Sequence, residues 1–103
     1  MKNKVYLKYI NQINLKFSPF SPSSKATRIF LARVMNNKLS EENPKIVINT
    51  TLLTDVNEEP QISVTYRDGK KLELFPGERN IDEVLQIVGK HLRKLKEKEE
   101  FTN

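Results

Sequence analysis

One segment, QISVTYRDGKKLELF at residues 61–75, restricts the fold more than any other part of the chain. Apolar residues alternate with polar ones on both sides of Asp68 and Gly69, which is the period of a half-buried strand. An Asp-Gly pair favours a tight turn between antiparallel strands, and we expect these two residues to form a two-residue turn. The segment therefore predicts a β-hairpin that buries Ile62 and Val64 on one face.

The sequence before the hairpin predicts a strand, a helix and a second strand. Residues 12–17 alternate between an apolar and a polar face, and Pro22 follows Ser21 in the manner of a capped helix start, so a helix should run from there to about residue 37. Residues 45–53, KIVINTTLL, are β-branched and nearly continuously apolar. That pattern predicts a strand buried on both faces and parallel to the first.

The sequence after the hairpin predicts one last helix and a polar tail. Asn80 is followed three residues later by Glu83, the spacing of a reciprocal helix cap, and apolar residues then recur every three or four positions up to Leu95. Residues 97–103 are charged and lack an apolar face until Phe101, so we expect either a solvated helix end or a tail that is disordered in the free protein.

These elements predict an α/β fold with the order β-α-β-β-β-α, a mixed four-stranded sheet and two helices. That is the outline of a minimal thioredoxin-like domain. A ferredoxin-like arrangement is the alternative, but it requires a strand after the last helix and the sequence shows none. The length of 103 residues suits one domain, which we place at residues 1–96 with a short basic N-terminal extension.

Charge is distributed unevenly along the chain. The net charge is +5, and residues 1–40 contain no Asp or Glu but carry eight cations: Lys2, Lys4, Lys8, Lys16, Lys25, Arg28, Arg33 and Lys38. A basic, acid-free segment in a small domain indicates a polyanion partner, most simply nucleic acid. If the protein is imported into mitochondria, we expect an uncleaved or internal signal, because the basic region continues into structured sequence.

Most catalytic chemistry is excluded by residue content. The chain has no cysteine, which excludes a thiol nucleophile, a redox pair, a thiolate zinc site and an iron–sulfur cluster. His91, the only histidine, is expected to be an ordinary surface or interface residue, and Glu58 and Glu59 offer at most weak binding of a hard cation. No phosphate-binding loop motif occurs, and no apolar run is long enough to span a membrane. We therefore expect no catalytic residue, metal, cofactor or small-molecule substrate.

Anion binding without catalysis remains. A helix N-terminus offers unpaired N–H groups and a partial positive charge, and the predicted start of the first helix adds hydroxyls and cations. The candidate phosphate-binding residues are Ser21, Ser23, Ser24, Lys25, Arg28 and Arg33. The alternative is that the serines only cap the helix and Lys25 is solvated.

Two further features suit contact with a partner. Lys90, Arg93 and Lys94 form a second basic group near the end of the last helix, where positive charge also stabilises the helix itself. Phe20 lies between two prolines, where it can pack on a base, on a protein neighbour or under its own loop.

The stretches LKFSPFS, SKATRIFLARV and LLTDVNEEPQISVTYRDGKKLEL together resemble the mitochondrial large-subunit ribosomal protein family fifty-three, particularly its fungal members. The resemblance extends from about Tyr9 to Leu95, and the family's K-F-x-P-F core falls on Lys16, Phe17, Pro19 and Phe20.

This resemblance implies a thioredoxin-like protein of the mitochondrial matrix that is not an enzyme. Its implied partners are ribosomal RNA and neighbouring large-subunit ribosomal proteins, and Lys16 joins the candidate RNA contacts. A non-catalytic accessory subunit of a respiratory complex is the alternative. A small-molecule enzyme that uses the loop as an anion site is a third class, and no base or nucleophile accompanies it.

Overall fold

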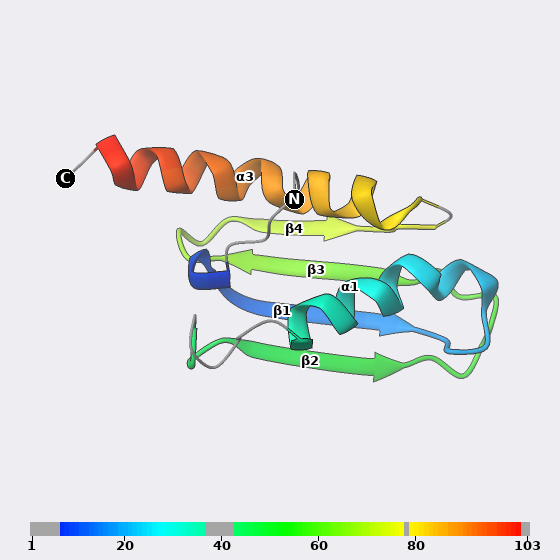
Figure 1. Ribbon diagram of the computed structural model, residues 1–103. Coiled ribbons are helices and arrows are strands. Elements are labelled where there is room, and N and C mark those ends of the chain that lie inside the picture. The colour runs from blue at the N-terminus through cyan, green and yellow to red at the C-terminus, as the bar shows by residue number, and fades with distance from the viewer. Residues whose placement is uncertain (1–6, 37–42, 78, 102–103) are drawn as a thin grey trace.

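The protein consists of a four-stranded mixed sheet with helices packed on one of its faces (Figure 1). The computed structural model describes residues 7–36, 43–77 and 79–101. The elements in chain order are η1 (Leu7–Tyr9), β1 (Ile10–Phe17), η2 (Pro22–Ser24), α1 (Lys25–Asn36), β2 (Val47–Leu52), β3 (Gln61–Tyr66), β4 (Lys71–Leu74) and α3 (Ile81–Phe101). The predicted α/β class, mixed four-stranded sheet and two helices are confirmed. Lys2, Lys4, Lys38 and the end of the predicted tail lie outside the described residues.

The strand order is β2-β1-β3-β4, with β1 parallel to β2 and antiparallel to β3. The predicted parallel pairing of the first two strands is therefore confirmed. Ile13, Leu15 and Phe17 of β1 face the helices and are buried, as the alternating pattern predicts.

The hydrophobic core lies between the sheet and the two helices. Phe30 and Val34 of α1 and Val88 and Leu92 of α3 are buried in one cluster with the inward-facing side chains of β1 and β3. The opposite face of the sheet carries polar side chains, among which Asn49 donates to Asn14 Oδ1 over 2.9 Å. Within the described residues this face has no helix over it, so the domain has two layers.

The hairpin forms with a different loop from the predicted one. Tyr66 N donates to Lys70 O over 2.8 Å and Gly69 N to Tyr66 O over 3.0 Å, so three residues, 67–69, lie in the loop and Gly69 has a φ of 96°. The predicted two-residue turn is wrong because of side-chain register. It would place Val64 opposite Glu73, whereas the observed register places Val64 opposite Leu72.

The prediction that residues 45–53 are buried on both faces is also wrong. β2 forms one edge of the sheet, and of its six residues only Ile48 is even half-buried. A central strand has neighbours on both sides, but an edge strand has one, and the outer face of this sheet is uncovered. Apolar composition alone does not distinguish the two positions.

The two predicted helix caps are confirmed. Ser21 caps η2 with Pro22 in the next position, and α1 continues directly from η2. At the other helix, Asn80 Oδ1 accepts from Glu83 N over 2.9 Å and Asn80 N donates to Glu83 Oε1 over 3.3 Å. α3 continues to Phe101, well beyond Leu95, so most of the charged tail is helical.

Candidate nucleic-acid interface

The start of α1 is built by three serines that bond to one another. Ser23 N donates to Ser21 Oγ over 3.3 Å, and Ser24 Oγ donates to Ser21 O over 2.7 Å. Ser21 and Ser24 are buried, and the hydroxyl oxygens of Ser21 and Ser23 lie 2.9 Å apart. These contacts fix the direction in which the chain enters the helix, so the buried serines act through the cap geometry.

Ser24 also positions a cation. Arg28 Nε donates to Ser24 Oγ over 3.0 Å, although the Arg28 side chain is otherwise exposed. A guanidinium has five N–H donors, of which this contact uses one. Arg28 is thereby held one turn from the helix start, with donors left for an anion.

The N-terminal ends of both helices open onto a single cleft of about 500 Å³. Its lining comes from η2, α1 and the segment that leads into α3: Pro22, Ser23, Lys25, Ala26, Ile29, Gly77, Arg79, Asn80 and Ile81. Two of these residues, Lys25 and Arg79, are exposed cations, and the described part of the lining includes no acidic residue.

The electrostatics of this cleft favour an anion. Each helix start contributes a partial positive charge, and Lys25 and Arg79 add full charges. Asp82 and Glu83, in the first turn of α3, carry opposing charges, and the Glu83 carboxylate is engaged in the cap with Asn80. Ala26, Ile29 and Ile81 supply apolar walls. A phosphate group, with three or four acceptor oxygens, suits such a lining.

The sequence-predicted residues do not all converge on this cleft. Ser23 and Lys25 line it and Arg28 lies one turn further along α1, whereas Arg33 is half-buried near the end of that helix. Lys16 lies on the open face of the sheet, because its neighbours Leu15 and Phe17 face the core.

Arg79 is the cleft residue that sequence reasoning missed. It lies 54 positions after Lys25 in the sequence. The two residues line the same cleft only because α3 begins beside the start of α1. The one available signal was its place directly before the Asn80 cap, where cations are not stabilised by the helix dipole.

The predicted partner contacts are exposed. Phe20 is 87% exposed, in the turn between β1 and η2, so it does not pack under its own loop. Lys90, Arg93 and Lys94 are exposed on α3, where spacings of three and four place them on one side of the helix.

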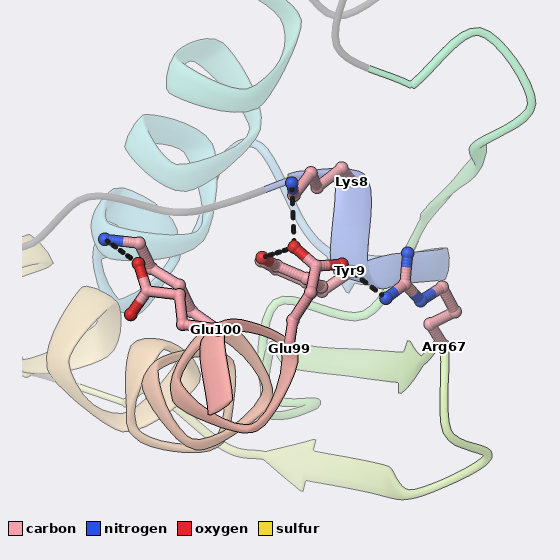
Figure 2. A network of polar contacts seen from close by, with 6 residues as sticks. Lys8, Tyr9, Arg67, Glu99 and Glu100 are labelled. Carbon is pink, nitrogen blue, oxygen red and sulfur yellow. Dashed lines mark hydrogen bonds and ion pairs between the residues drawn. The ribbon is translucent and has the colours of Figure 1, made fainter. Parts of the chain in front are cut away.

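A cluster around Glu99 holds the far end of α3 (Figure 2). Glu99 Oε1 accepts from the Tyr9 hydroxyl over 2.9 Å and lies 3.1 Å from Lys8 Nζ, while Glu99 Oε2 lies 3.1 Å from an Arg67 terminal nitrogen. The hydrogen bond from Tyr9, followed by those from Lys8 and Arg67, lowers the pKa of Glu99 from 4.5 to about 2. This cluster joins α3 to η1 and to the hairpin loop.

His91 joins α3 to the hairpin as well. Its Nε2 lies 2.9 Å from Asp68 Oδ2, and its ring meets Tyr66 edge-on at 4.7 Å between centroids. The N–H of Lys70, and then His91, lower the pKa of the Asp68 carboxyl. The Tyr66 hydroxyl donates to Val88 O over 2.9 Å, so these contacts fasten the helix to the sheet.

The described residues contain no group of three or more His, Cys, Asp or Glu side chains placed to hold a metal ion. In the same part of the chain, no helix is both long and apolar enough to cross a membrane.

Comparison with known proteins gives a consistent family. The model of the family described as "39S ribosomal protein L53/MRP-L53" matches residues 17–69, which include the start of α1 and the hairpin loop. A protein of Schizosaccharomyces pombe named "Large ribosomal subunit protein mL53" is 33% identical over 93 residues, covering 88% of this chain and 92% of the relative.

Two further relatives carry the same name. The protein of Saccharomyces cerevisiae is 28% identical over 89 residues, covering 85% of this chain and 88% of the relative. The protein of Neurospora crassa is 27% identical over 96 residues, covering 93% of this chain and 96% of the relative. The similarity therefore spans nearly the whole of each protein.

Proposed function

The chain belongs to the L53 family of mitochondrial large-subunit ribosomal proteins, and from this membership we propose that it is a structural constituent of the large subunit of the mitochondrial ribosome. In this role it binds ribosomal RNA and neighbouring ribosomal proteins in the mitochondrial matrix. It is not an enzyme and has no small-molecule substrate. The relatives, all named as ribosomal proteins, give no support to the alternative of a respiratory-complex subunit.

The observation that carries the RNA-binding proposal is the cleft between the start of α1 and the start of α3. Lys25 and Arg79 flank it, no acidic residue is among the described residues of the lining, and Arg28 is held nearby by Ser24. A phosphate of the RNA backbone fits there through main-chain N–H groups and cations, which gives affinity without reading base sequence. Ser23 adds a hydroxyl, while Ser21 and Ser24 support the site by shaping the cap.

Other predicted residues complete the proposed contacts. Lys16 and Arg33 bind phosphates away from the cleft, Lys16 from the open face of the sheet and Arg33 from near the end of α1, and Phe20 packs on a base or on a protein neighbour. The exposed side of α3 with Lys90, Arg93 and Lys94 contacts a second partner. These contacts place the protein between RNA and other proteins of the subunit.

We also assign the fold to the thioredoxin-like class, as a single domain at residues 1–96 whose last helix extends into the charged segment after it. The strand order β2-β1-β3-β4, with a parallel β1–β2 pair and an antiparallel β3–β4 hairpin, supports this assignment. The packing of α1 against α3 over the same face supports it further.

Co-sedimentation with the large mitoribosomal subunit tests the proposal. Changing Lys25 and Arg28 to Glu reverses two charges at the start of α1 and should deplete the protein from the subunit fraction. Changing Lys70 and Lys71 to Glu makes the same charge change on the hairpin and should leave the protein in that fraction.

The ribosomal assignment and the RNA contact fail in different ways. Sedimentation with respiratory membranes after nuclease and high salt have stripped the ribosomes would refute the assignment to the ribosome. Normal co-sedimentation of the Lys25 and Arg28 variant would refute only the proposed contact.

A further inference from the structure

The outer edge of β2 has no neighbouring strand among the described residues. β2 pairs with β1 alone, and Figure 1 shows β2 at the lower border of the sheet with no element beyond it. An open edge presents unpaired main-chain N–H and C=O groups, which form a template for another strand.

The hydrogen-bond pattern identifies the residues that face outward. Leu53 N donates to Phe17 O over 2.8 Å, so Leu53 and every second residue before it point their main-chain groups toward β1. The intervening residues are Ile48, Thr50 and Leu52, whose N–H and C=O groups therefore point away from the sheet. The edge presents three donors and three acceptors in alternation.

This edge lacks the features that normally prevent strand addition. Residues 46–54 contain no charged residue, proline or glycine, and the register with β1 is regular. Val47 is 49% exposed and Leu52 is 61% exposed. The opposite edge, β4, is short and carries Lys71 and Glu73, so only the β2 edge is unprotected.

We propose that two copies of the free protein pair through this edge, with β2 of one copy antiparallel to β2 of the other around a two-fold axis at Thr50. In that register Ile48 of each copy lies opposite Leu52 of the other, and Thr50 lies opposite itself. All three residues point their main-chain groups outward, so each pair exchanges two hydrogen bonds. The cross-strand pairs also cover Leu52, an exposed apolar side chain.

Charge at the two ends of β2 fixes this antiparallel register. Lys45 lies two residues before β2 and Asp55 three residues after it, at equal distances in sequence from Thr50. Antiparallel pairing brings Lys45 of each copy near Asp55 of the other, whereas parallel pairing would place like charges together. Neither side chain forms an ion pair with another described residue, so both are available to the second copy.

The proposal goes beyond the ribosomal role because it concerns the protein before assembly and its test needs no ribosome. The contact is a single strand edge, so the interface belongs to the small, weak class and dimerisation should depend on concentration. A free copy thereby covers an edge that would otherwise invite aggregation.

Sedimentation equilibrium of the purified full chain tests the proposal. The apparent mass should rise from the monomer mass of 12.0 kDa toward twice that value as concentration increases. Thr50→Lys places two like charges directly opposite each other and should raise the dimer dissociation constant by about tenfold or more. Thr51→Lys adds the same charge on the other face of β2, opposite Asn49 of the second copy, and should change it by less than about threefold.

Charge exchange and cross-linking test the register. Lys45→Asp and Asp55→Lys should each weaken the dimer, and the double variant should restore it because the ion pairs re-form with their signs exchanged. The chain has no native cysteine, so Thr50→Cys gives a single thiol that a short bismaleimide should link between copies. Lys71→Cys, on the β4 edge, should give no covalent dimer.

Three results would overturn the proposal. The first is a monomer at every concentration up to about 1 mM, which would put the dissociation constant above that concentration. The second is association that Thr50→Lys leaves unchanged. The third is protection of the Ile48, Thr50 and Leu52 amides from hydrogen exchange only in the assembled ribosome, which would show that a neighbouring protein covers the edge.

Discussion

Removal of cations from the cleft should reduce the salt dependence of RNA binding by a calculable amount. Lys25, the first residue of α1, and Arg79, in the segment that leads into α3, both line the cleft. Each phosphate contact contributes about 0.9 to the slope of log affinity against log salt for duplex RNA, taking the duplex DNA value, and about 0.7 for a single strand. Between about 1 M and about 0.1 M salt, a slope of 0.9 corresponds to a roughly eightfold gain in affinity, or about 1.2 kcal/mol of binding free energy.

Neutral substitutions of similar length isolate the charge. Lys25→Gln and Arg79→Gln should each lower the slope by about 0.7–0.9, and the double variant by about twice that amount. The assay is filter binding of the purified protein to the mitochondrial large-subunit ribosomal RNA over a range of KCl concentrations. Lys71→Gln removes one charge from the β4 edge and is the matched control.

A double variant with an unchanged slope would refute the assignment of a phosphate to the cleft. The same holds if Lys71→Gln lowers the slope as much as either cleft variant, because the binding would then depend only on net charge. Thermal unfolding of each variant verifies that the helix starts remain folded.

The remaining predictions concern stability. Gly69→Ala should lower the free energy of unfolding in urea by about 1–2 kcal/mol, because the φ of 96° disfavours any L side chain. A Cβ at this position would meet no atom within 4 Å, so the cost comes from the backbone conformation and not from a clash. A loss under about 0.3 kcal/mol would contradict the loop geometry. Asn80→Ala should cost about 1 kcal/mol and Asn80→Ser much less, and equal losses would show that the side-chain cap is unimportant. Glu99→Gln should lower the melting temperature above pH 4.5, because a carboxyl whose folded pKa is depressed stabilises the folded state when ionised. That difference should vanish as pH falls from 4.5 toward the folded pKa of about 2, and a difference independent of pH would contradict the ionic contacts with Lys8 and Arg67.

Local signals predicted the elements of this fold well. The alternation in β1 and the two caps, at Ser21 and at Asn80, depend on residues within a few positions of one another, and all three predictions are confirmed. Features that depend on distant neighbours were missed. The hairpin loop follows from the pairing of Val64 with Leu72, which overrides the preference of Asp-Gly for a shorter turn.

Tertiary placement also explains the two largest surprises. The composition of β2 suits a central strand, but its neighbours are set by how the whole sheet is ordered, and it lies at an edge. Lys25 was identified from the residues around it, whereas Arg79 reaches the same cleft only through the packing of α1 against α3. Sequence reasoning therefore found one half of the candidate site.

α3 connects the two ends of the molecule as a rigid spacer. Its first residue, Ile81, lines the cleft, and Glu99, near its last turn, is held by η1 and the hairpin loop. A helix of 21 residues is about 30 Å long. Any partner that binds at the cleft therefore sets the position and orientation of a surface about 30 Å away.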